Sequence, residues 1–120
     1  TKMKKIEAII RKTKSDEVKE ALREVGIEFF SFWDVRGVGQ VREERMYRGV
    51  VYDTSTIERI IFSIIVRDKN VKKTVDAVLK AAWTGEIGDG KVFVSGIEES
   101  YRIRTGETGD ASLFIKGKEE

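Results

Sequence analysis

The sequence has 120 residues, of which 40% are hydrophobic and 37% charged, with a formal net charge of +2 from 23 basic and 21 acidic residues. This length and balance predict one globular domain, residues 1–120, with a real hydrophobic core. So small a net charge argues against a nucleic-acid partner, and any anion site must be local. The chain has no Cys and no His, which excludes disulfides, a His-based triad and a side-chain transition-metal site. No apolar run approaches the ~18 residues of a membrane span. We therefore expect a cytoplasmic protein without membrane insertion.

The first third of the chain predicts a strand, a helix and a second strand. Alternation over residues 5–11 predicts a strand with one apolar face made by Ile6, Ala8 and Ile10. Ser15 is expected to cap a helix that ends at Gly26 and buries Val18, Ala21, Leu22 and Val25. Residues 29–36, rich in aromatic and β-branched side chains, predict the second strand.

The apolar pattern is lost over residues 37–56, which predicts a long central loop. Residues 47–52 could form a short hairpin arm within it. Long loops in compact domains are usually functional or disordered. A functional loop and a solvated insertion both fit this segment.

The pattern of strand, helix and strand then returns. Residues 57–66 are almost continuously apolar, which predicts a strand buried on both faces. Asn70 is expected to cap a helix whose apolar stripe is Val71, Val75, Val78, Leu79 and Ala82. A strand at 91–95 and a shorter extended piece at 101–104 follow, before a loose, charged tail over about 109–120.

These two similar halves predict an α+β, ferredoxin-like double βαβ fold with two helices on one face of an antiparallel sheet. A strand that is apolar on both faces then has only one face covered. Open apolar surface costs roughly 25 cal/mol per Å². We therefore expect identical subunits to associate through the uncovered face, in a ring.

The stretch from Thr84 to Lys91 carries the strongest chemical signal. Its three glycines allow backbone N–H groups to converge on an anion, and Lys91 adds a positive charge. Arg102 and Arg104, two apart on an expected strand, would project the same way. Such a set suits a polyphosphate, although an ordinary helix-to-strand connection would look similar. It is not a P-loop, because Val92 stands where Ser or Thr is needed and the helix precedes the loop.

Several blocks together resemble the PII signal-transduction proteins of nitrogen regulation, over about residues 3–108. These blocks are Met3-Lys4-Lys5-Ile6-Glu7-Ala8-Ile9-Ile10, Asp34-Val35-Arg36-Gly37-Val38-Gly39, Tyr47-Arg48-Gly49, Gly88-Asp89-Gly90-Lys91 and Arg102-Ile103-Arg104-Thr105-Gly106-Glu107. The resemblance implies a homotrimer with three sites between subunits, where ATP and ADP compete. It implies that phosphates are wrapped by Gly88, Asp89, Gly90 and Lys91 and reached from the neighbouring subunit by Arg102 and Arg104. Gly37, Val38 and Gly39 would close the site, Ser31 would lie near the adenine, and Ile65 would lie on the strand that lines the base.

The resemblance also implies that the central loop controls partners such as an ammonium transporter or a metabolic enzyme. The segment 39–47 is about one residue shorter than the family pattern. The missing residue allows two alignments. In one, Gln40 matches the family Gln that helps to hold Mg²⁺ and 2-oxoglutarate, and the phosphate-binding Arg of the family is lost. In the other, this family Gln has no counterpart in the chain. Arg59 stands where the family has an oxoglutarate-binding Lys, and a guanidinium can still meet a carboxylate.

Two loop residues match positions with known roles in the family. Arg48 matches an arginine that enters an ammonium channel, or it pairs with Glu43 or Glu44. Tyr52 matches a tyrosine that some bacterial members uridylylate, or it is unmodified.

The leading hypothesis is thus a non-enzymatic regulator that binds ATP or ADP and signals through its central loop. One alternative is a related sensor of another small molecule, in metal or bicarbonate handling. Another is a slow ATP hydrolase using Asp89 or Glu107, although Asp89 could instead hold the glycine turn through an Asx-type hydrogen bond.

Overall fold

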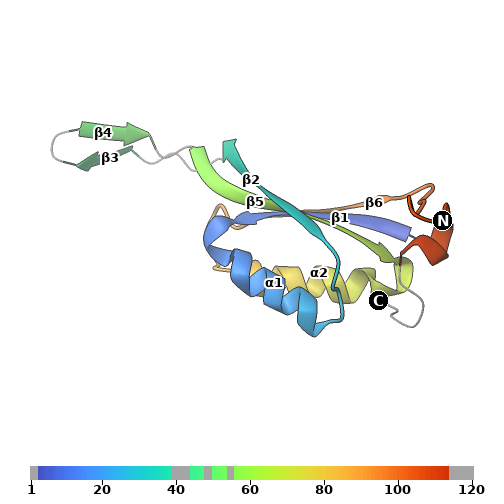
Figure 1. Cartoon of the computed structure of the whole chain (residues 1–120). Helices are drawn as coiled ribbons and strands as arrows, with labels where there is room; N and C mark the ends of the chain where they lie inside the picture. Colours follow the sequence, from blue (N-terminus) through green and yellow to red (C-terminus); the bar gives the residue numbers. More distant parts are fainter. Residues whose placement is uncertain (1–2, 39–43, 48–49, 54–55, 114–120) are drawn as a thin grey trace.

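The computed structural model describes residues 3–38, 44–47, 50–53 and 56–113. Four antiparallel strands form one sheet in the order β2-β5-β1-β6, and both helices cover one of its faces (Figure 1). The main elements are β1 (Met3–Arg11), α1 (Ser15–Glu24), β2 (Ser31–Val38), β5 (Thr56–Arg67), α2 (Asp68–Ala82) and β6 (Gly90–Gly96). The predicted ferredoxin-like α+β architecture is confirmed.

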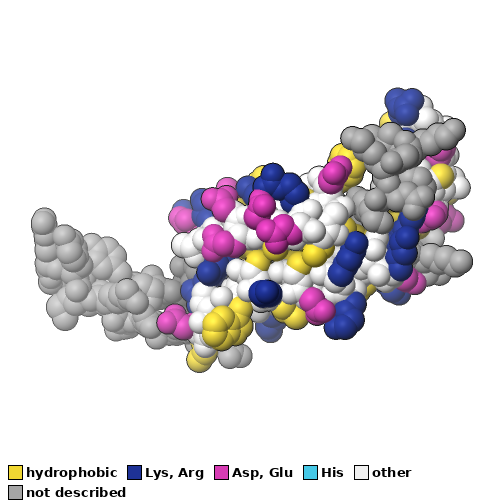
Figure 2. Space-filling view, turned by 90° about the horizontal axis from the view of Figure 1, so that it is seen from below, with side chains coloured by type: hydrophobic (Ala, Val, Ile, Leu, Met, Phe, Trp, Pro, Cys, Tyr) yellow, Lys and Arg dark blue, Asp and Glu magenta, His cyan; other side chains and the backbone are white. Residues whose placement is uncertain are grey.

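A hydrophobic core lies between the sheet and the two helices. Alternate residues of β1 and β5 point into it, because successive side chains of a strand face opposite sides. The fully buried members include Ile6, Ala8, Phe62, Ile64, Val66, Val18, Leu22 and Val78. Seen from the helix side, acidic and basic side chains are interspersed over this covered face (Figure 2).

Among the residues that the structure describes, no layer covers the opposite face of the sheet. The register places Ile61 of β5 between Trp33 of β2 and Ile9 of β1 on that face. Ile61 and Ile65 are only partly buried, so the prediction that β5 is buried on both faces is wrong for a single chain. The reason is the one anticipated from the topology, since both helices pack on the same side.

The helix α1 starts and ends through backbone geometry. A short 3₁₀ helix, η1 (Lys12–Lys14), leads directly into it, and the Ser15 N–H bonds to the Lys12 carbonyl. Ser15 is therefore the first helical residue and not the predicted N-cap, which is Lys14. At the other end, Gly26 has φ +86° and the Ile27 N–H donates to the Leu22 carbonyl at 2.9 Å. This is a Schellman termination, as the glycine predicted.

The buried face of α2 differs from the predicted stripe. The helix begins at Asp68 with Arg67 as N-cap, so the predicted cap Asn70 lies inside the first turn. Its buried row is Asn70, Thr74, Val78 and Ala82, whereas Leu79 is 54% exposed. Thr74 fits in this row because its hydroxyl donates to the Asn70 carbonyl at 2.7 Å. A hydrophobic stripe alone misses a face that includes satisfied polar side chains.

The described part of the central segment contains a two-stranded hairpin. The strand β2 begins at Ser31, after Phe29 and Phe30, and continues to Val38, which pairs with Thr56. Beyond this pair, β3 (Glu44–Tyr47) and β4 (Val50–Asp53) form the short hairpin expected near residues 47–52. The hairpin projects past the ends of β2 and β5 (Figure 1).

The last described segment folds into turns. Tyr101 makes a single bridge to Thr108, and residues 103–105 form a turn, so the predicted extended piece at 101–104 is wrong. The turn closes because the Gly106 N–H donates to the Arg102 carbonyl at 2.7 Å. A second 3₁₀ helix, η2 (Gly109–Ser112), occupies the start of the expected loose tail, and residues 114–120 lie outside the described residues. Within the described residues, the helices are all too short or too polar to cross a bilayer.

Candidate functional site

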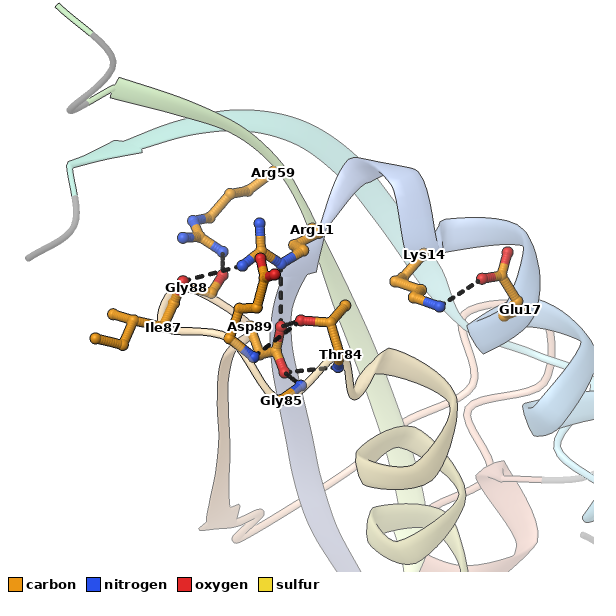
Figure 3. A network of polar contacts seen from close by, with 10 residues as sticks. Arg11, Lys14, Glu17, Arg59, Thr84, Gly85, Ile87, Gly88 and Asp89 are labelled. Atoms are coloured by element: carbon orange, nitrogen blue, oxygen red, sulfur yellow. Dashed lines mark hydrogen bonds and ion pairs between the residues drawn. The ribbon is translucent and has the colours of Figure 1, made fainter. Parts of the chain in front are cut away.

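The glycine-rich stretch forms the connection between α2 and β6, at one end of the sheet (Figure 3). Gly85, Gly88 and Gly90 have φ of +88°, +102° and +108°, a region that residues with a Cβ rarely enter. A Cβ at Gly90 would also lie 1.8 Å from the Ile9 carbonyl oxygen. The helix precedes the loop and a strand follows it, which agrees with rejecting a P-loop.

Asp89 holds this loop together. Its carboxylate accepts hydrogen bonds from the Thr84 N–H at 2.7 Å, the Gly85 N–H at 3.0 Å and the Thr84 hydroxyl. Arg11 Nε lies 3.0 Å from the same carboxylate. The hydrogen bonds from Thr84, with help from Arg11 and Gly85, hold the pKa of Asp89 well below its usual range. The predicted turn-holding role fits, but the N–H donors precede Asp89, so this is not an Asx turn.

Two guanidinium groups support the loop from the sheet side. Arg11 Nη2 donates to the Ile87 carbonyl at 3.0 Å, and Arg59 Nη1 donates to the Gly88 carbonyl at 2.8 Å (Figure 3). Burial, and then the nearby charge of Arg11, lower the pKa of Arg59. The two arginines stand opposite each other in the register of β1 and β5, where like charges repel. Asp89 and the loop carbonyls offset that repulsion.

Sequence reasoning singled out Arg59 but missed Arg11. The signal available was position, since Arg11 ends β1 at the level where β5 carries Arg59. Pairing of residues 48 positions apart in sequence requires the register, and one sequence does not give it.

A second group of predicted residues lies at the other end of the sheet. Ser31 and Ile65 line one hollow of about 410 Å³, together with Phe29, Phe30, Ser63, Glu28, Ser112 and Leu113. Ser31 is the register partner of Ser63. The two predicted base-side residues are thus neighbours in space.

Arg102 lies beside this hollow through the carboxy-terminal turn. Its guanidinium donates to Glu107 Oε1 and to the Ala111 carbonyl, both at 3.1 Å. Arg104 is exposed within the turn at 103–105. The two arginines do not share a strand face, so that prediction is wrong.

The predicted site residues therefore form two groups in one chain. Arg59 and Ile65 are six positions apart on β5, which separates the glycine loop from the hollow by ~20 Å. Gly37 belongs with the loop, because a Cβ there would contact the Arg59 side chain at 3.4 Å, and Lys91 is the second residue of β6, directly after Gly90. Val38 ends β2 and Tyr52 lies in β4, while Gly39, Gln40 and Arg48 lie outside the described residues.

The fold is that of a double-βαβ protein with a glycine-rich loop and two arginines at one end of its sheet. The family model described as "Nitrogen regulatory protein P-II" matches residues 3–107. The chain is 48% identical over 104 residues to the nitrogen regulatory protein P-II of Bradyrhizobium diazoefficiens, covering 86% of this chain and 93% of the relative. It is 46% identical, with the same coverage, to that of Rhizobium meliloti.

Solved structures agree with this relationship. Arabidopsis thaliana PII bound to citrate superposes with a TM-score of 0.75 at 32% identity, covering 93% of this chain and 92% of that one. The GlnK structure from B. subtilis gives a TM-score of 0.77 at 29% identity, covering 94% and 100%. The chain belongs to the PII family. It is a signal-transduction regulator of nitrogen metabolism, and the family is not one of enzymes.

Proposed function

We propose that the protein binds ATP and ADP between subunits of a homotrimer and uses its central hairpin to control a partner. The observation that carries this proposal is the ~20 Å separation of the two groups on β5. One chain offers a phosphate-type loop at one end and a base-sized hollow at the other. A second copy must bring its hollow to the loop for one nucleotide to touch both.

The uncovered sheet face supplies a reason for such assembly. Trp33 is 43% exposed and Phe93 50% exposed on that face, around Ile61 and Ile9. Burying this surface between copies removes apolar area from water. When one patch meets a different patch on the next copy, identical subunits form a closed ring if the rotation between copies closes.

The phosphates would meet Lys91 and the backbone of Gly88 to Gly90 from one subunit and Arg102 and Arg104 from the next. Arg102 now pairs with Glu107, whose side chain is 44% exposed. An exposed pair of this kind is worth ~0–1 kcal/mol. A polyphosphate, with more charge and more acceptor oxygens, can displace it.

The output would pass through the hairpin of β3 and β4. It extends from the end of the sheet that carries the glycine loop (Figure 1), so a nucleotide there is well placed to bias its conformation. Gln40 is the proposed residue for a nucleotide-bound Mg²⁺. Arg48 and Tyr52 are the proposed contacts for an ammonium transporter or a metabolic enzyme in the cytoplasm.

A carboxylate effector such as 2-oxoglutarate is a second candidate ligand. The Arg11 and Arg59 guanidinium groups would hold it, and a relative is described as bound to citrate. Because Arg59 already donates to the Gly88 carbonyl, the effector would compete with a bond that shapes the phosphate loop. Binding of the effector and of nucleotide would then be thermodynamically linked.

Titration calorimetry with ATP, ADP and AMP, each with and without 2-oxoglutarate and Mg²⁺, tests the proposal alongside sedimentation. We expect a trimer with up to one nucleotide per chain and no measurable ATP turnover. A monomer, or a protein that ignores ATP and ADP at millimolar concentration, would refute it. ATP turnover in the usual enzyme range of ~1–10³ s⁻¹ would favour the hydrolase alternative, to which the strongly ionised, fully bonded Asp89 is poorly suited.

A further inference from the structure

We propose that Arg67 is a positioning residue for nucleotide binding, because it fixes the carboxy-terminal turn as one wall of the base-sized hollow. This rests on the proposed nucleotide site and names a residue of β5 that the sequence did not single out. The wall consists of residues 109–113, of which Ser112 and Leu113 line the hollow opposite Ser31 and Ile65.

The contact that defines this role joins the end of β5 to η2. Arg67 Nε lies 2.7 Å from Asp110 Oδ1, and the Arg67 side chain is only 11% exposed. A short, charge-assisted contact from a nearly buried guanidinium fixes direction better than a loose surface pair. Arg67 belongs to the rigid sheet, two positions from Ile65 on the same strand face. One strand therefore supplies both the floor of the hollow and the anchor of its wall.

Other hydrogen bonds tie the turn to its own segment. The Gly109 N–H donates to the Ser100 carbonyl at 2.9 Å, and the Ser100 and Ser112 hydroxyls lie 2.5 Å apart. Arg102 donates to the Ala111 carbonyl at 3.1 Å. These bonds shape the turn, and the Arg67–Asp110 pair joins it to the strand that carries Ile65.

Loss of this pair should therefore weaken contacts to the base and leave contacts to phosphate unchanged. The variant Arg67→Met keeps the aliphatic stem and removes the charge, and Asp110→Asn removes the pair from the exposed side, where folding is not at risk. We expect either variant to weaken the binding affinities for ATP and for ADP by the same factor, about threefold. Inorganic tripolyphosphate has no base, so the affinity of either variant for it, measured by competition with nucleotide, should equal that of the wild type. The double variant Arg67→Asp with Asp110→Arg should recover part of the loss.

The control is Arg23→Met, which removes an exposed ion pair with Glu20 on α1, away from the hollow. It should leave the affinities for ATP, ADP and tripolyphosphate unchanged. A larger loss for ATP than for ADP would place the effect on the phosphates and overturn the inference. Unchanged ATP and ADP binding in both variants would overturn it as well, while leaving the nucleotide site intact. A wild-type protein that binds no ATP would instead overturn the proposed function, and this inference with it.

Discussion

The replacement Gly90→Ala tests whether the glycine loop is built for the fold itself before any ligand is present. The new Cβ would lie 1.8 Å from the Ile9 carbonyl oxygen and 2.9 Å from its carbon. Both are backbone atoms of the neighbouring strand, so no side chain can move aside. Since carbon and oxygen normally stay ~3.3 Å apart, β6 must retreat from β1 by about 1.5 Å at the pair Ile10–Gly90.

The cost has two parts. A side chain at φ +108° is strained by roughly 1–3 kcal/mol. Breaking the adjoining strand contact leaves a backbone group unsatisfied, which costs ~1–3 kcal/mol. We expect a total of about 3 kcal/mol or more. With a urea m-value of ~1.5 kcal/mol/M, the unfolding midpoint should fall by about 2 M.

Urea unfolding followed by far-UV circular dichroism measures this loss in nucleotide-free protein. Gly106→Ala is the matched control, because it has φ +73° and nothing within 4 Å of an added Cβ. This replacement introduces the backbone strain without a steric clash, and it should lower the free energy of unfolding by ~1–2 kcal/mol. Equal destabilisation by the two replacements would refute the close-approach argument and leave conformational strain as the whole effect.

Three further predictions follow from the same contacts. Asp89→Asn should cost ~1–2 kcal/mol at pH 7. Because the folded pKa of Asp89 is depressed, the wild type begins to lose this advantage as pH falls below about 4, the unfolded pKa, so the difference between the urea midpoints should narrow steadily below that pH. Val78→Ala should destabilise by ~2 kcal/mol and Leu79→Ala by less than ~0.5, measured by thermal unfolding; comparable losses would restore the stripe predicted from sequence, which holds both residues. Ile61→Glu, on the uncovered sheet face, should dissociate the oligomer in sedimentation while the chain stays folded.

The architecture could be predicted from the sequence because the local signals for strands, helices and turns were strong and mutually consistent. Alternation in β1, the apolar run of β5 and Gly26 each specify one local structure, and together they allow few topologies. Where prediction failed, a tertiary contact outweighed a local preference. Ser15 continues a 3₁₀ turn instead of capping the helix, and Thr74 enters the core through a bond to a backbone carbonyl.

At the candidate site, too, local features could be predicted and features that depend on tertiary contacts could not. The glycine pattern at 84–91 marked a tight loop at the candidate site, because only a few backbone shapes need that many glycines. Arg11 and Arg67 were missed, since each acts through a residue distant in sequence, Asp89 or Asp110. The expected common face of Arg102 and Arg104 failed because hydrogen bonds within residues 101–108 fold that segment into a turn.

Subunit mixing tests the shared site most directly. Lys91→Glu damages the loop half, and Ser31→Trp fills the hollow half; neither variant alone should bind ATP. If each site joins the loop of one chain to the hollow of another, mixed trimers refolded from equal amounts should recover about a quarter of the wild-type sites. If a single chain held the whole site, every chain in the mixture would remain defective. If the mixture binds no ATP although both variants fold and assemble, the account is contradicted.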